Sequence, residues 1–136
     1  MSSQWNFYFS NVNNSLASIF VDLGLQKIAP SADNPWLLWV WVQFNHPRED
    51  GLSSAEEYAV LLQIEDSLKE AVGTAVNGFP AGRITTDGRR EFYFYGPTFA
   101  GFDDAVARCM ELFPKYKWDS GTQEDADWNH YREVLY

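Results

Sequence analysis

The clearest feature of the sequence is an unbroken run of apolar residues at positions 36–44, WLLWVWVQF. A strand with one face in water alternates apolar and polar residues, whereas this run is apolar at almost every position. Successive side chains of a strand point to opposite faces, so the run divides into two sets. One face carries Trp36, Leu38, Val40, Val42 and Phe44, and the other carries Leu37, Trp39, Trp41 and Gln43. The pattern predicts the central strand of a sheet that is covered on both faces.

Two strands are predicted before this run, at residues 5–9 and 18–25. Asn13 and Asn14 lie between them and favour a turn with positive φ, so the two segments are expected to form an N-terminal β-hairpin. Residues 27–35 contain two prolines and several small polar residues, which is typical of a connecting loop.

A long helix is predicted after the central strand, from Ser53 or Ser54 to about Gly73. Each serine is followed three residues later by a glutamate, which is the spacing of a capping box. The predicted apolar stripe consists of Tyr58, Leu61, Ile64, Leu68 and Val72, while Glu57, Glu65, Lys69 and Glu70 lie off it.

A second hairpin is predicted over residues 81–95, with an Asp-Gly turn at positions 87 and 88. In this register Thr85 lies opposite Arg90, and Arg83 lies opposite Phe92. One face of the hairpin therefore carries Arg83, Thr85, Arg90, Phe92 and Phe94, and the other carries Ile84, Glu91, Tyr93 and Tyr95.

Three further elements follow the hairpin. Asp103 is expected to cap a second helix, and Thr122 is expected to cap a final one. Between them, Tyr116 and Trp118 indicate a short last strand. The inward residues of the two helices are predicted to be Phe102, Val106, Cys109, Met110 and Phe113 in the former, and Trp128, Tyr131 and Leu135 in the latter.

This order of elements predicts the fold class α+β. From the central strand onward it is strand, helix, strand, strand, helix, strand, the ferredoxin-like split βαβ core (βαββαβ), with an N-terminal β-hairpin and a C-terminal helix added. We expect a single domain over residues 1–136. Such a core leaves one sheet face without helices, so its aromatic residues need cover. The candidates for that cover are the added elements of the chain, a homodimer packed through the sheet face, or a partner or ligand.

Composition narrows the classes of partner. The 136 residues carry a formal net charge of −9, and such a field repels a phosphate backbone, so we do not expect a nucleic acid as partner. The longest apolar run is shorter than the roughly 20 residues that a membrane helix needs, so no membrane role is expected. The single cysteine, Cys109, fits a reducing compartment. We therefore expect a cytoplasmic protein.

The sequence contains no clear catalytic or metal-binding motif. Its two histidines, His46 and His130, are far apart in the chain, and Cys109 lies on an apolar helix stripe that suits a buried side chain. Residues 119–127 are rich in acids but lack the glycine spacing of a calcium loop. We therefore assign no catalytic residue, no metal ligand and no cofactor.

Several features together resemble an uncharacterised family, domain-of-unknown-function family 695. They are Trp5 with Tyr8, Pro47 with the Asp-Gly-Leu at 50–52, Glu57 with residues 64–66, Gly82 with Arg83, the block at 90–95, and the tail residues 116–119, Trp128, Tyr131 and Leu135. This family is similar in architecture to the regulator B of ribonuclease E activity, an acidic bacterial protein that inhibits an RNA-processing endonuclease. The resemblance implies a non-enzymatic, regulatory, protein-binding role and carries over no catalytic residues.

The leading hypothesis is therefore an acidic module that binds another protein. Its proposed surface consists of Asp119, Glu124, Asp125 and Asp127, together with exposed aromatic residues.

The alternative is a small-ligand-binding protein or hydrolase with an aromatic pocket on the sheet and Arg83 or Arg90 holding an anion. The pocket residues would be Trp39, Trp41, Tyr93 and Tyr95. RNA binding along residues 90–95 is a third hypothesis, which the net charge and Glu91 disfavour.

Overall fold

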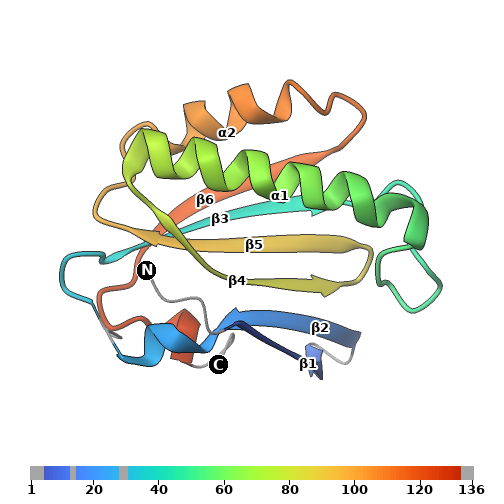
Figure 1. Ribbon diagram of the computed structural model, residues 1–136, viewed down its shortest axis with the longest axis horizontal. Coiled ribbons are helices and arrows are strands. Elements are labelled where there is room, and N and C mark those ends of the chain that lie inside the picture. Colours follow the sequence, from blue (N-terminus) through green and yellow to red (C-terminus); the bar gives the residue numbers. More distant parts are fainter. Residues whose placement is uncertain (1–4, 13–14, 28–30, 133–136) are drawn as a thin grey trace.

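The computed structural model describes residues 5–12, 15–27 and 31–132, and it shows a mixed α+β fold (Figure 1). Six antiparallel strands form one sheet in the order β1-β2-β4-β5-β3-β6, with two helices packed on it. The expected α+β class is therefore confirmed. The elements are β1 (Trp5–Val12), β2 (Ser15–Asp22), the 3-10 helix η1 (Leu23–Lys27), β3 (Trp36–Gln43), α1 (Ala55–Val76), β4 (Phe79–Thr86), β5 (Arg89–Gly96), α2 (Phe102–Met110) and β6 (Trp118–Glu124).

The apolar run forms β3, which lies inside the sheet between β5 and β6. Both of its predicted faces contribute to a core, because the two sides of the sheet each bury a separate apolar cluster. On the helix side, Leu38, Val40 and Val42 pack with the buried residues of α1 and α2. On the opposite side, which we call the far face, Leu37 is buried and Trp39 packs at the edge of the cluster.

Helix α1 has the predicted start and most of the predicted stripe. Ser54 is its N-cap and accepts a hydrogen bond from the Glu57 N–H at 3.4 Å. The stripe prediction is wrong at three positions: Tyr58 is 46% exposed, whereas Glu57 and Glu65 are buried. Both carboxylates are buried because they have partners. Glu57 accepts hydrogen bonds from backbone N–H groups of the segment after β3, and Glu65 forms an ion pair with Arg83.

The β4–β5 hairpin has the predicted register, with Thr85 opposite Arg90 and Arg83 opposite Phe92. Its two turn residues, Asp87 and Gly88, both have positive φ, as a two-residue hairpin turn requires. The predicted cap of α2 is wrong, because Asp103 lies within the first turn of the helix and its carboxylate does not cap it.

The C-terminal prediction is wrong in its starting point. Thr122 lies in β6 and pairs with Leu38 of β3, so it does not cap a helix. Helical residues begin only at 129, after a turn, and the structure describes them to 132. An acid-rich segment can pair as a strand here because it lies at the sheet edge, where most of its side chains are exposed to water. The predicted Asn13-Asn14 turn and Leu135 lie outside the described residues.

The far face is covered from within the chain. Strand β2 contributes Ala17, Ile19 and Val21 to the far-face cluster, and Trp128 and Tyr131 after β6 complete it. Residues 23–25, predicted as strand, belong to η1 instead. Leu25 is nevertheless buried in the same cluster.

The two helices cover only part of the opposite side of the sheet. Six strands at about 4.8 Å each occupy about 29 Å, whereas two helices of about 10 Å each cover about 20 Å. In Figure 1, α1 and α2 lie along β3, β5 and β6, while neither of these two helices lies along the β1–β2 hairpin at the bottom of the view. The helix side of that hairpin is therefore left open.

Gly121 provides a test of the packing between β3 and β6. A Cβ atom at this position would overlap the indole ring of Trp39 on the paired strand. We expect Gly121→Ala to lower the free energy of unfolding by about 1–3 kcal/mol, because the rigid ring has to move. Urea denaturation measures this. The control is Gln123→Ala, an exposed position on the same face of β6, which should stay within about 0.5 kcal/mol of the parent. Equal midpoints for both variants would contradict this packing.

Candidate functional site

The open area beside the β1–β2 hairpin contains a groove of about 470 Å³. We call it the arginine–aromatic groove. The loop after β3 and the start of α1 form one wall, and β1 and β2 form the other. Its lining residues are Phe7, Phe9, Ser18, Phe20, Arg48, Leu52, Ser53, Tyr58, Arg83, Thr85 and Arg90.

Strand pairing places these residues together. Across the sheet, Phe9 pairs with Ser18, Ser18 with Thr85, and Thr85 with Arg90. The small side chains of Ser18 and Thr85 thus lie between the exposed ring of Phe9 and the guanidinium of Arg90. Because neither side chain fills the space above the sheet, the row forms the floor of the groove.

Arg90 is the most unusual residue of the groove, because it is charged and only 3% exposed. Its Nε donates to Thr85 Oγ1 at 3.0 Å, and its Nη2 donates to Ser53 Oγ at 3.3 Å. Nη1 is buried and has no hydrogen-bond partner within the described ranges. Burial, together with the nearby charge of Arg83, lowers the pKa of Arg90 to about 10, so the side chain remains charged at neutral pH.

The other cations of the groove have acidic partners. Arg83 pairs with Glu65, which also pairs with Lys69 at 3.2 Å, and Arg48 pairs with Asp50 at 2.7 Å. The guanidinium of Arg83 also lies 4.7 Å from the ring centroid of Phe20. Arg90 differs from these cations, because no described carboxylate forms an ion pair with it. Glu65 and the ring of Tyr58 compensate the charge only in part. A buried charge without a direct ion pair is costly, so an anion bound in the groove would stabilise Arg90.

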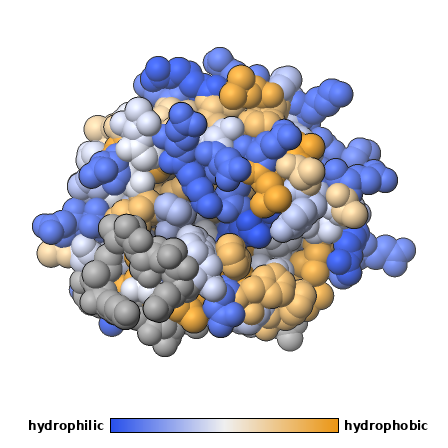
Figure 2. All heavy atoms as spheres, in the orientation of Figure 1, coloured by the Kyte–Doolittle hydropathy of each residue, from blue (hydrophilic) through white to orange (hydrophobic). Residues whose placement is uncertain are grey.

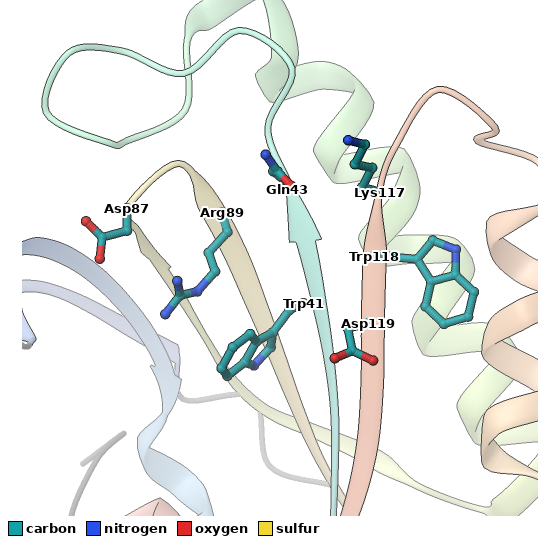
Figure 3. Close-up of a pocket in the computed structure, with 7 residues that line it drawn as sticks. All are labelled: Trp41, Gln43, Asp87, Arg89, Lys117, Trp118 and Asp119. Carbon is teal, nitrogen blue, oxygen red and sulfur yellow. The ribbon is translucent and has the colours of Figure 1, made fainter.

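A second hollow, of about 280 Å³, lies on the far face at one end of β3 (Figure 3). Arg89 lies over the ring of Trp41, 4.6 Å from its centroid, and pairs with Glu91 at 2.7 Å. Trp39 packs against Trp41 with ring centroids 5.1 Å apart. The hollow is lined by Trp41, Gln43, Asp87, Arg89, Lys117, Trp118 and Asp119. Its two cationic and two acidic lining residues balance in charge, so the hollow has no excess charge for a ligand to neutralise.

The two tyrosines of the far face make hydrogen bonds within the protein. Tyr95 is fully buried and donates to Asp125 Oδ2 at 2.7 Å, and Tyr93 donates to Glu91 Oε1 at 2.6 Å. The ring of His130 packs against that of Tyr93 in a tilted arrangement, with ring centroids 4.2 Å apart. Burial lowers the pKa of the His130 imidazole. The negative charges of Asp125 and Glu91 act in the other direction and offset part of this shift.

The structure therefore separates residues that the alternative hypothesis combined. Arg83 and Arg90 face the helix side of the sheet. The four aromatic residues assigned to that pocket lie on the far face, where Tyr93 and Tyr95 are buried. The groove that contains Arg83 and Arg90 is lined by none of these four aromatic residues.

The four acidic residues of the proposed interaction surface lie in different environments. Asp119, Glu124 and Asp127 are exposed, on β6 and the turn after it. Asp125 is buried, and its carboxylate accepts hydrogen bonds from the backbone N–H groups of Asn129 and His130. Asp125 thus holds the C-terminal turn against the sheet.

The two histidines lie apart from any described metal-binding cluster. His46 is exposed in the segment after β3, whereas His130 faces Tyr93 across the far face. Within residues 5–12, 15–27 and 31–132, no three side chains of His, Cys, Asp or Glu lie close enough to hold a metal ion. Cys109 is buried in α2. None of the described helices is long and apolar enough to cross a bilayer.

Sequence reasoning missed most of the groove. The residues not recognised were Phe7, Phe9, Phe20, Arg48, Ser53 and Tyr58. A signal was present in β1, where Phe7 and Phe9 alternate with Asn6, Tyr8 and Ser10. Alternation shows that one face of a strand differs from the other, but it does not show which face a partner covers.

Fold and site together define a mixed α+β protein with one cationic groove beside its β1–β2 hairpin. The chain belongs to a family of unknown function (DUF695), which it matches over residues 3–136. The resemblance to that family is therefore confirmed. No curated protein and no solved structure matches the chain.

The role of Asp125 can be tested by substitution. Asp125→Ala leaves the buried hydroxyl of Tyr95 and two backbone N–H groups without their acceptor. We expect the free energy of unfolding to fall by about 2–4 kcal/mol. Thermal unfolding followed by near-UV circular dichroism measures it. Glu124→Ala, an adjacent but exposed acid, is the control and should change stability by less than about 0.5 kcal/mol. Similar losses in the two variants would contradict the anchoring role.

Arg90 is predicted to be unnecessary for stability. Arg90→Met removes an unpaired buried charge, and we expect the free energy of unfolding to stay unchanged or to rise by about 0.5–2 kcal/mol. Arg83→Met is the matched comparison. It leaves the buried carboxylate of Glu65 without its arginine and should lower stability by about 2–3 kcal/mol. Urea denaturation at pH 7 measures both. An equal loss in the two variants would show that Arg90 supports the fold.

Proposed function

We propose that the protein is a non-enzymatic, regulatory binding module that holds a segment of another protein in the arginine–aromatic groove. The observation that carries this proposal is Arg90, a charged side chain that is buried beside an open groove with one nitrogen unpartnered. A binding site commonly retains a group that weakens the free protein, because the ligand supplies the missing interaction.

Exposed apolar side chains beside the groove support a macromolecular partner. Phe7 is 50% exposed and Phe9 is 57% exposed, and their rings contact each other with centroids 5.1 Å apart. Leu16 and Tyr58 are exposed nearby on the same side of the molecule. Figure 2 shows apolar residues gathered over the β1–β2 hairpin at the lower right of the view. Contiguous apolar exposure of this kind is typical of an interaction surface.

The charge distribution supports an acidic partner segment. The chain as a whole has a formal net charge of −9, yet three arginines line this one groove. Distant parts of an acidic partner are repelled by the bulk of the protein, so only a segment with its negative groups correctly placed gains from the groove. The arrangement favours specificity over raw affinity.

We also propose that β3, α1, β4, β5, α2 and β6 form a ferredoxin-like unit. Its support is the antiparallel strand order β4-β5-β3-β6 with two helices on one side. The family resemblance drawn from the sequence extends to the regulator B of ribonuclease E activity, which acts by binding an enzyme, and it supports the same kind of role for this chain. An RNA-processing enzyme is therefore one candidate partner, in a cytoplasmic setting.

Site-directed photo-crosslinking tests the proposed function. A photoreactive residue replaces Phe9 at the groove or, as the matched control, Gln123, which is exposed on β6 at the opposite edge of the sheet. In lysate of the source cells, we expect the probe at position 9 to form adducts with one other protein and the probe at position 123 to form none.

Other crosslinking results would overturn the proposal. Adducts only at position 123 would favour the acidic side of the molecule, near Asp119 and Glu124. An adduct between two copies of the chain would identify the hairpin as a homodimer interface. The absence of adducts at both positions would overturn the proposal that the protein is a binding module.

A further inference from the structure

We propose that the arginine–aromatic groove binds a phosphate monoester carried on an aromatic ring. This inference deepens the proposed function and rests on it, because it assigns the phosphate to a phosphorylated aromatic side chain in the partner segment. A free aryl phosphate has the same recognition chemistry and serves as the simplest probe of the site.

The excess of charge at the groove favours an anion. Arg48, Arg83 and Arg90 line the groove. Two acids, Asp50 and Glu65, form ion pairs with Arg48 and Arg83. The lining cations therefore exceed their acidic partners by one positive charge, which lies on Arg90. A phosphate monoester carries about −1.5 to −2 at pH 7 and can supply the missing negative charge.

The donors around Arg90 point to the same ligand. The hydroxyl oxygens of Thr85 and Ser53 accept hydrogen bonds from Arg90, so their hydrogens remain free to donate to a ligand. Together with Nη1 of Arg90, they bring three donor groups into one hydrogen-bonded cluster of residues that line the groove. A phosphate monoester presents three terminal oxygens in three directions, whereas a carboxylate presents two in one plane. No described acidic side chain lines the groove to compete for these donors.

The remainder of the groove suits an aromatic ring. Its volume of about 470 Å³ is larger than a phosphate group needs. The walls on either side of the donor cluster are aromatic, with Phe7, Phe9 and Phe20 on the hairpin and Tyr58 on α1. Aromatic rings that pack edge to face or offset-stacked gain about 0.5–1.5 kcal/mol beyond simple burial, which favours an aryl ester over an aliphatic one.

Binding of small probes to the whole protein tests the chemistry. Phenyl phosphate, inorganic phosphate and benzoate are each titrated into isotope-labelled protein, and amide chemical shifts are followed by NMR. We expect phenyl phosphate to bind at least tenfold more tightly than benzoate, with shifts centred on Ser18, Thr85 and Arg90. Inorganic phosphate should bind more weakly than its phenyl ester. Benzoate binding as tight as that of phenyl phosphate, or no saturable shift with any probe, would overturn the proposal.

Substitutions test separately which residues bind the phosphate and which bind the aromatic ring. Arg90→Met should lower the affinity for phenyl phosphate by about tenfold or more, since a charge-assisted hydrogen bond contributes at least that factor. Arg108→Met is the control, because Arg108 is exposed on α2 away from the groove. Phe9→Ala should weaken phenyl phosphate but not inorganic phosphate. If Arg90→Met does not fold, Thr85→Val should still weaken both probes. Unchanged affinity in Arg90→Met or in Thr85→Val would overturn the site.

A peptide distinguishes a partner-borne phosphate from a free one. A phosphotyrosine peptide with apolar neighbours should bind at least tenfold more tightly than phenyl phosphate, because it also covers Phe7 and Phe9. Equal affinities would overturn the assignment to a partner and identify a small aryl phosphate as the ligand. If position 9 crosslinks to a partner but no phosphate binds, this inference fails and the proposed function stands.

Discussion

Strand β3 is apolar on both faces and lies inside the sheet, so both sides of the sheet have to be shielded from water. Helices α1 and α2 shield one side with a cluster that includes Leu38 and Val40. On the far face the shield comes from strands and from the C-terminal segment, because β2 adds its own apolar residues and Trp128 packs against Tyr95 with ring centroids 4.2 Å apart. The two ends of the chain therefore converge on the face that the helices leave bare, and the buried carboxylate of Asp125 fixes the second of them in place.

The groove results from the way in which the far face of the sheet is covered. A strand that contributes one face to the far-face core must turn its other face toward the helix side. For β2 that other face carries Ser18 and Phe20, which line the groove between the hairpin and the start of α1. The sheet is wider than its two helices, so the hairpin stands partly uncovered and meets the arginines of β4 and β5. Leaving Arg90 without an ion-pair partner destabilises the free protein. Binding of an anion in the groove can offset that cost.

Several parts of the fold could be predicted from sequence because they depend on local pattern. The apolar run of β3 and the β4–β5 register around an Asp-Gly turn are both set by residues close together in the chain. The predictions for Tyr58, Glu57 and Thr122 were wrong for a shared reason. Hydropathy placed the tyrosine inside and the glutamate outside, but exposure was decided by partners distant in sequence. Glu57 is buried because backbone N–H groups of another segment donate to it. Thr122 has an extended conformation because its segment pairs with β3.

The sequence by itself determined that the molecule is a layered α+β protein, that β3 lies inside the sheet, and that Arg83 and Arg90 share one face of a hairpin. Periodicity encodes these features, since side-chain direction in a strand follows from chain geometry alone. The sequence did not determine the position of β3 in the sheet, which is next to the edge strand β6 and not at the centre. Only the tertiary structure decided that this face carries exposed phenylalanines on β1, that Arg83 has a carboxylate partner while Arg90 has none, and that Asp125 is buried. The physical reason is that burial and charge compensation depend on which segments meet in space, and the pairing of β2 with β4 joins residues more than 60 positions apart.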